Sequence, residues 1–304
     1  MERAVTAVVA TPFALAPWMA AQLARVEAAL EQAFCTEGPA GLGEAMRYAV
    51  QGGGKRLRPL LVLAACEAVG GQPEAALRAA CAVELIHAYS LVHDDMPCMD
   101  NDVLRRGKPT VHVQFGQAQA LLAGDALQAL AFELLTPEAG VAPAVQARLC
   151  RLLARAAGAE GMAGGQAIDL AHVGRAMDEQ ALRRMHALKT GALLQASVEM
   201  GAACGAPPAA AWAALARYGA AIGLAFQVVD DVLDVTQDSA TLGKTAGKDA
   251  AAAKPTYVSL MGLEPARAYA ARLLDEAQAQ LAASGLADTR ALAALADMVV
   301  HRSH

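Results

Sequence analysis

Aromatic side chains, charged side chains and closely spaced cysteines are all scarce in this chain of 304 residues. Phe, Trp and Tyr together make up 4%, whereas most β-sheets are covered by aromatic and β-branched residues, so a β-rich fold is not expected. Charged residues make up 18%, too few for a disordered chain, and the net charge of −5 excludes a protein that binds nucleic acid through bulk positive charge. We therefore expect a folded protein without a nucleic-acid partner.

The cysteines and the apolar runs indicate the cellular compartment of the protein. The six cysteines, at positions 35, 66, 81, 98, 150 and 204, include no Cys-x-x-Cys pair and predict neither a zinc site nor a disulfide framework. The apolar run 5–19 begins like a secretion signal, but Pro12 and Pro17 interrupt it. No later run reaches the roughly 20 unbroken apolar residues that cross a bilayer. We expect a cytoplasmic protein with no stable membrane insertion.

Alanine, the best helix former, supplies about a quarter of the residues. Apolar residues recur at helical spacing over residues 17–37, 60–69, 73–93, 118–135, 143–157, 178–188, 209–235 and 265–283. No repeat, charge block or low-complexity linker divides the chain. The sequence predicts an all-α fold, a single large helical bundle around a central cavity, with one domain over residues 1–304.

Carboxylates crowd together where one predicted helix ends. Asp94, Asp95 and Asp100 follow the apolar run 73–93, and Pro97 forces the chain out of the helix. Carboxylates are unfavourable at a helix C-terminus and repel one another. A solvated acidic loop is the ordinary alternative, but its flank would be polar, and this flank is largely apolar. We therefore expect a divalent cation to compensate the charge.

A second acidic cluster lies inside the helical pattern 209–235. Asp230 and Asp234 are four residues apart and share one helix face, with Asp231 beside them and Gln227 one turn before. Two such clusters on two helices can clamp hard cations between them. Oxygen-rich sites of this kind suit magnesium and a polyphosphate substrate.

Basic residues that suit phosphate oxygens occur in four short segments, and His87 lies two helical turns before Asp94. They are Lys55, Arg56 and Arg58 after three glycines, Arg105 and Arg106 before Gly107, Lys189 at an expected helix end, and Lys244, Lys248 and Lys254 in the candidate lid 241–255. Each one alone is ordinarily a solvated charge or, for His87, a core residue. Their occurrence beside two acidic helices favours an anion site.

In this order the motifs resemble the trans-isoprenyl diphosphate synthase family, and most of all its bacterial farnesyl diphosphate synthases. The resemblance rests on Asp94-Asp95-x4-Asp100 followed by Arg105-Arg106-Gly107, and on Asp230-Asp231-x2-Asp234. Segments 53–59, 123–127, 164–170 and 186–191 support it, and it extends from about residue 41 to the C-terminus. A lone Asp-Asp-x-x-Asp would be a weak signal, because terpene cyclases share it.

The resemblance implies a magnesium-dependent prenyltransferase with the isoprenoid synthase fold, usually a homodimer. It would condense isopentenyl diphosphate head to tail with the allylic diphosphates dimethylallyl and geranyl diphosphate. It implies that magnesium, three ions with substrate bound, is held by Asp94, Asp95, Asp100, Asp230, Asp231 and Asp234. The implied allylic-site residues are Arg105, Lys189, Thr190, Gln227, Lys244 and Lys254, all but the last of them catalytic. The implied isopentenyl diphosphate pocket is Lys55, Arg58, His87 and Arg106, and Asp169 is implied as a supporting residue.

The chain length of the product is predicted from Tyr89, five residues before Asp94. A bulky ring at this place on the helix would point down the path of the growing tail and stop it, so farnesyl diphosphate (C15) is the expected product. In the alternative, Tyr89 is a core aromatic and the reaction ends at geranyl or geranylgeranyl diphosphate. A non-catalytic partner subunit is disfavoured, because both acidic motifs are complete. The weakly basic end 301–304 argues against closure of the site by the tail.

Overall fold

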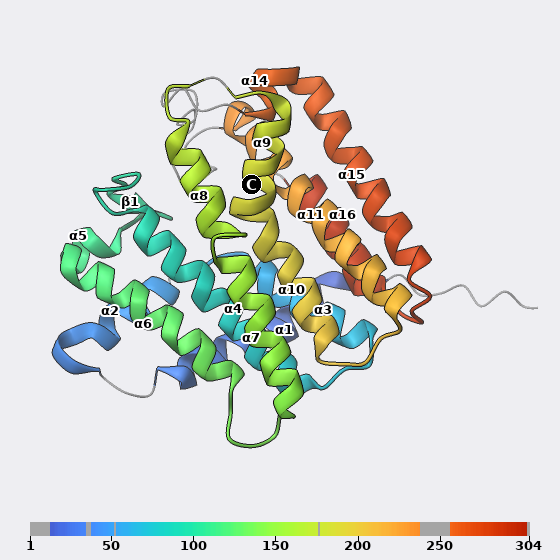
Figure 1. Cartoon of the computed structure of the whole chain (residues 1–304), viewed down its shortest axis with the longest axis horizontal. Helices are drawn as coiled ribbons and strands as arrows, with labels where there is room; N and C mark the ends of the chain where they lie inside the picture. The colour runs from blue at the N-terminus through green and yellow to red at the C-terminus, as the bar shows by residue number, and fades with distance from the viewer. Residues whose placement is uncertain (1–12, 35–37, 52, 176, 238–255, 303–304) are drawn as a thin grey trace, which may run out of the picture.

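The computed structural model describes residues 13–34, 38–51, 53–175, 177–237 and 256–302. Most of the candidate secretion signal lies outside these residues, as does the candidate lid 241–255 with Lys244, Lys248 and Lys254. The described part is almost entirely helical (Figure 1), which confirms the all-α prediction.

Most consecutive helices are joined by short connections (Figure 1). In chain order they are α1 (Leu15–Ala33), α2 (Leu42–Val50), α3 (Leu57–Ala68), α4 (Pro73–Asp94), α5 (Val111–Phe115), α6 (Gln117–Leu135), α7 (Pro143–Ala157), α8 (Met162–Ala171), α9 (Glu179–His186), α10 (Ala192–Ala203), α11 (Ala209–Thr236), α14 (Tyr257–Met261), α15 (Leu263–Ala283) and α16 (Arg290–His301). A 3-10 turn, η1 (Pro39–Gly41), precedes α2, and a π-helical turn, η2 (Ala187–Gly191), joins α9 to α10. Strands β1 (Leu104–Arg105) and β2 (Lys108–Pro109) form a small antiparallel hairpin.

All eight segments with helical spacing contain a helix, and α7 begins and ends at the predicted residues. Helices α2, α5, α8, α10, α14 and α16 lie outside these eight segments and were not predicted. In α10 nearly every side chain is buried, so its apolar residues show no preferred face and no helical period.

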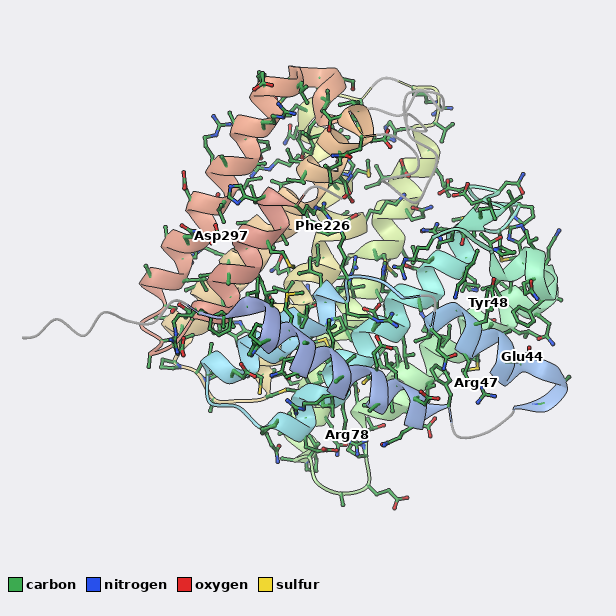
Figure 2. All side chains as sticks on the ribbon, turned by 180° about the vertical axis from the view of Figure 1, so that it is seen from behind. Glu44, Arg47, Tyr48, Arg78, Phe226 and Asp297 are labelled. Atoms are coloured by element: carbon green, nitrogen blue, oxygen red, sulfur yellow. The ribbon has the colours of Figure 1, made fainter. Side chains whose placement is uncertain are left out.

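Small residues let the central helices approach closely. Helix α4 packs against α3 and α6, and α10 packs against both α3 and α11. A Cβ atom at Gly201 of α10 would meet the Val62 carbonyl of α3, and one at Gly223 of α11 would lie 2.8 Å from Gly191 Cα of η2. Helix α1 lies across the opposite face of the bundle (Figure 2). Gly201 and Gly223 therefore allow these helices to pack closely.

Three helices, α4, α6 and α11, are long and apolar enough to cross a membrane by length and composition. The expectation from sequence concerned unbroken apolar runs, whereas these three helices meet the limit by mean hydropathy over an 18-residue window. Most of the apolar windows of α4 and α11 is buried against other helices, whereas only 33% of that of α6 is buried. Helix α6 thus carries an apolar face that the described part of the chain leaves uncovered.

Candidate functional site

The end of α4 places the first acidic cluster at a cavity of about 380 Å³. The helix ends at Asp94, as Pro97 predicts, and the chain then turns back so that the Asp100 amide donates to the Asp94 carbonyl at 2.9 Å. The Asp94 side chain lines the cavity. Burial raises the pKa of Asp94 to about 6, and the negative charge of Asp100 adds to this shift while Lys189 opposes it. A cation bound here would favour the ionised carboxylate.

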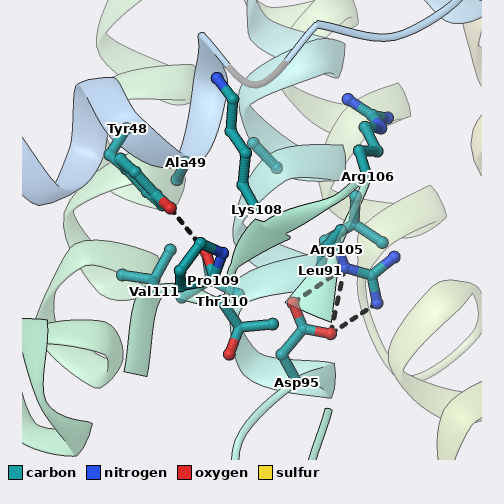
Figure 3. A pocket seen from close by; sticks show the side chains of 12 residues that line it. Tyr48, Ala49, Leu91, Asp95, Arg105, Arg106, Lys108, Pro109, Thr110 and Val111 are labelled. Carbon is teal, nitrogen blue, oxygen red and sulfur yellow. Dashed lines mark hydrogen bonds and ion pairs between the residues drawn. The ribbon is translucent and has the colours of Figure 1, made fainter. Parts of the chain in front are cut away.

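Asp95 lies in a separate, smaller pocket beside the hairpin (Figure 3). Its carboxylate accepts hydrogen bonds from Arg105 Nε at 2.8 and 3.0 Å and from Arg105 Nη2 at 2.6 Å. This fork-on-carboxylate geometry is a strong, charge-assisted arrangement. Asp95, expected as a magnesium ligand, therefore binds Arg105, which was expected at the allylic diphosphate. Arg106 points away from this pair (Figure 3).

The second acidic cluster lies on one unbroken helix, as its spacing predicted. Asp231 is buried and accepts hydrogen bonds from Gln227 Nε2 and from the backbone amide of Tyr257, both at 2.8 Å. The Gln227 carbonyl in turn accepts from the Thr190 hydroxyl at 3.2 Å. Asp231 thus connects α11 with the start of α14 and with η2. Asp234 is buried one turn further along.

Arg302, the last described residue, lies on the second acidic cluster. Its Nη2 atom donates to Asp230 Oδ1 at 2.6 Å and to the Phe226 carbonyl at 2.8 Å, and its guanidinium lies 3.9 Å from the centre of the Phe226 ring. This contact was not expected from the weakly basic end 301–304. One arginine was a weak signal, and only the fold shows that it reaches Asp230.

Lys189 does not end a helix, so this expectation was wrong. It lies in the π-helical turn η2, through which the helix continues into α10. Its Nζ atom donates to Asp169 Oδ2 of α8 at 2.6 Å, and a Cβ atom at Gly165 would collide with the Lys189 backbone. Such turns often occur at functional sites because they re-aim side chains. Here Lys189 and Thr190 both line the cavity with Asp94.

Positive charge gathers on another part of the same cavity, which Arg58 and His87 line. Burial, with Arg58 and Arg106 nearby, holds the pKa of His87 well below its usual value. Burial and Arg302 also lower the pKa of Lys55. The Arg106 guanidinium donates to the Gly53 carbonyl and lies where a Cβ at Gly54 would be. A bound diphosphate would relieve this crowding of cations.

Arg56 is the one basic residue of this loop that serves the fold. It is buried and donates to Glu84 Oε1 at 2.8 Å, to Glu27 Oε1 at 2.7 Å and to the Val50 carbonyl at 2.8 Å. It therefore anchors the loop that presents Lys55 and Arg58. Position in the chain alone does not distinguish Arg56 from its two basic neighbours, Lys55 and Arg58.

Apolar and aromatic side chains also line the cavity. Tyr89 is one of them and packs edge-on against His93, with ring centroids 5.7 Å apart. Met162 of α8 is another and also belongs to the adjoining hydrophobic core. The cavity thus combines the charged groups Asp94 and Lys189 with bulky side chains.

Carboxylate oxygens of this kind fit magnesium better than softer metals. Within the described residues, no three acidic, histidine or cysteine side chains gather closely enough to hold a metal by themselves. Magnesium is ordinarily held by one or two carboxylates together with water and substrate phosphates, so Asp94, Asp100 and Asp230 suit it without forming a closed cage.

Comparison with known proteins places these features in a family. Residues 39–292 match the family described as polyprenyl synthetase. The chain is 52% identical over 277 residues to the probable farnesyl diphosphate synthase of Bradyrhizobium diazoefficiens, covering 88% of this chain and 82% of the relative. It is 46% identical over 305 residues to the chloroplastic geranylgeranyl pyrophosphate synthase of Capsicum annuum, and this match covers 100% of this chain and 83% of the relative.

Solved structures agree in fold. An FPP/GFPP synthase from Zymomonas mobilis superposes with a TM-score of 0.84 at 44% identity, covering 94% of this chain and 98% of that one. The geranyltransferase of Helicobacter pylori, solved with magnesium and isoprenyl diphosphate, superposes with a TM-score of 0.82 at 34% identity, covering 95% and 97%.

Proposed function

Since the chain belongs to the polyprenyl synthetase family and is a prenyltransferase that elongates prenyl diphosphates, we propose that it makes mainly farnesyl diphosphate from isopentenyl diphosphate and dimethylallyl or geranyl diphosphate. One observation carries the proposal. A single cavity has Asp94 and Lys189 at its charged part, Arg58 and His87 beside them, and Tyr89 in its apolar wall.

The allylic diphosphate binds through Lys189, Thr190, Gln227 and Arg105, with Lys244 and Lys254 contributed from outside the described residues. Isopentenyl diphosphate binds at the cations Lys55, Arg58 and Arg106, with His87 beside them as a neutral hydrogen-bonding group. The acidic clusters, Asp94, Asp95 and Asp100 with Asp230, Asp231 and Asp234, hold magnesium, three ions with substrate present. When bound, magnesium neutralises the diphosphate and makes it a better leaving group.

The reaction needs no protein nucleophile. The allylic carbon–oxygen bond breaks to give a diphosphate anion and an allylic cation, and Lys189 stabilises the anion. The isopentenyl double bond attacks the cation and forms the new carbon–carbon bond. The resulting cation on the isopentenyl unit then loses a proton to the released diphosphate, and the electron pair of that C–H bond forms the new double bond. Binding both substrates in one cavity supplies proximity, and the apolar wall excludes water that would quench the cation.

The assembly we propose is a cytoplasmic homodimer with one domain over residues 1–304. The apolar face of α6 supports a dimer. Leu121 and Leu122 are exposed on it, as is Val113 of the neighbouring α5. Exposed apolar patches of this kind commonly mark protein–protein contacts. The described cysteines are all unpaired, which suits a reducing compartment.

A geranylgeranyl product is the second candidate, because relatives at 44–47% identity bear that name. Incubating the purified chain with magnesium, isopentenyl diphosphate and dimethylallyl diphosphate, then dephosphorylating and separating the products, tests both. We expect farnesol, and nothing when EDTA is present. Geranylgeraniol would keep the reaction and reject the stop at C15. No product from folded protein with magnesium would reject the proposal.

A further inference from the structure

One polar side chain in the wall of the cavity has no role in the reaction described above. Gln166 of α8 lines the cavity and is only 8% exposed, yet within the described residues neither its amide nitrogen nor its amide oxygen has a hydrogen-bond partner. Buried amides are nearly always paired, because an unpaired one loses its hydration without compensation. An unpaired amide that faces a substrate cavity points to a partner that arrives with the substrate.

The position of Gln166 along α8 shows which part of a substrate it meets. Four residues on, and so one turn away, Leu170 also lines the cavity and is 39% exposed. Four residues before, Met162 is buried in the core. Asp169, which holds Lys189, lies three residues after Gln166. Gln166 therefore lies about one turn, roughly 5 Å, below the level of the cationic Lys189 toward the apolar wall.

The first carbons of an allylic diphosphate lie at this depth. They follow directly on the diphosphate that Lys189 binds, and they carry the positive charge once the carbon–oxygen bond has broken. The other amide in this region is already engaged, because Gln227 accepts from Thr190 and donates to Asp231. Gln166 is free to turn its carbonyl oxygen toward the developing charge, and a fixed dipole in a water-poor cavity stabilises such charge strongly.

We propose that Gln166 is a catalytic residue of this enzyme, whose amide carbonyl faces the first carbons of the allylic substrate and stabilises the cation that forms there. This inference rests on the proposed function. The contribution arises in the transition state and hardly at all in the neutral ground state, so it belongs to kcat and not to substrate affinity.

The test compares two non-reacting probes on the wild type and on Gln166→Met, which keeps the length of the side chain and removes the dipole. One probe is an ammonium analogue of the allylic cation, added with inorganic diphosphate and magnesium. The other, called the neutral probe because its hydrocarbon part carries no charge, is an allylic thiodiphosphate of equal chain length, added with magnesium. Calorimetry measures both affinities. We expect about tenfold weaker binding of the ammonium probe and a change below about twofold for the neutral probe, with kcat about tenfold lower at nearly constant KM.

Gln280→Met, the same replacement at a half-buried glutamine on α15 that lies outside the cavity and pairs with Arg217, is the matched control and should change neither affinity. Equal weakening of both probes would show that Gln166 shapes the cavity or binds diphosphate, and would overturn the proposal. No change in either probe would overturn it as well. If Gln166→Met fails to fold, Gln166→Leu takes its place with the same expectations. The ratio of the two affinities does not depend on turnover, so it stays informative even if the expected product is not formed.

Discussion

Arg302 and Asp230 form an ion pair with 2.6 Å between Nη2 and Oδ1. Asp230 belongs to the second acidic motif, so the end of this chain neutralises a carboxylate that we propose for magnesium. The guanidinium is further held by the Phe226 carbonyl and ring. An arginine and a magnesium ion compete for the same oxygen, and we infer that metal binding displaces Arg302.

Removing this competitor should make magnesium easier to bind. With Arg302→Gln, we expect the magnesium concentration for half-maximal activity, at saturating substrates, to fall about fivefold. Arg290→Gln removes the same charge from an exposed pair with Asp288 and is the control, with no expected change. A magnesium requirement that stays constant or rises in Arg302→Gln would show that the pair does not compete with metal.

Tyr89 should set the length of the product. Tyr89→Ala opens the apolar wall of the cavity, so elongation continues, and we expect geranylgeranyl or longer diphosphates to replace farnesyl diphosphate. Chromatography of the dephosphorylated products measures the change as a ratio, which does not depend on how much folded protein is present. Tyr269→Ala, an aromatic truncation on α15 outside the cavity, is the control. An unaltered C15 product from folded Tyr89→Ala would show that Tyr89 is a core aromatic and does not set the chain length.

The longer helices and both acidic motifs could be predicted from local sequence, because the spacing of residues along one helix determines which of them share a face. Asp230 and Asp234 illustrate this, since α11 is unbroken through both. The pattern also located the end of α4, because Pro97 acts on its own neighbours.

The remaining features depend on contacts between distant segments. The sequence indicates a helix end at Lys189, whereas in the structure Lys189 lies in a π-helical turn, and its backbone packs closely on Gly165 of α8. Arg56 and Arg58 differ by two positions, yet one meets Glu27 and Glu84 while the other lines the cavity. The missing partner of Gln166 is likewise a property of the cavity and not of the motif.

Arg56 should matter for stability more than any exposed arginine. Its side chain and that of Glu84 are each only 4% exposed. Arg56→Ala leaves the Glu84 carboxylate buried without its partner, so we expect the free energy of unfolding to fall by about 3–5 kcal/mol. Arg78→Ala breaks an exposed pair with Glu74 on α4 and should cost about 1 kcal/mol or less (Figure 2). Denaturant unfolding measures both, and equal losses would contradict the buried-pair argument.

His186 should make the fold sensitive to acid. It is 7% exposed and stacks on Tyr257 with ring centroids 5.6 Å apart. Burial lowers its pKa to about 4, against an unfolded value of 6.5. Between these values the unfolded chain binds a proton that the folded chain does not, so stability is lost as the pH falls from 6.5 to 4 and is fully present above 6.5. The whole loss amounts to about 3 kcal/mol.

His186→Phe keeps the ring stacked on Tyr257 and removes the titrating group. Other groups act in the opposite direction, because the raised pKa of Asp94 favours the folded state as the pH falls. The informative quantity is therefore the difference in unfolding free energy between wild type and variant, measured in urea at pH 7.5 and again near pH 4.5. We expect the wild type to lose about 2–3 kcal/mol more than His186→Phe over this interval. His301→Gln, at an exposed site on α16, should follow the wild type. Parallel curves for wild type and His186→Phe would mean that the buried imidazole accepts a proton as readily as in the unfolded chain.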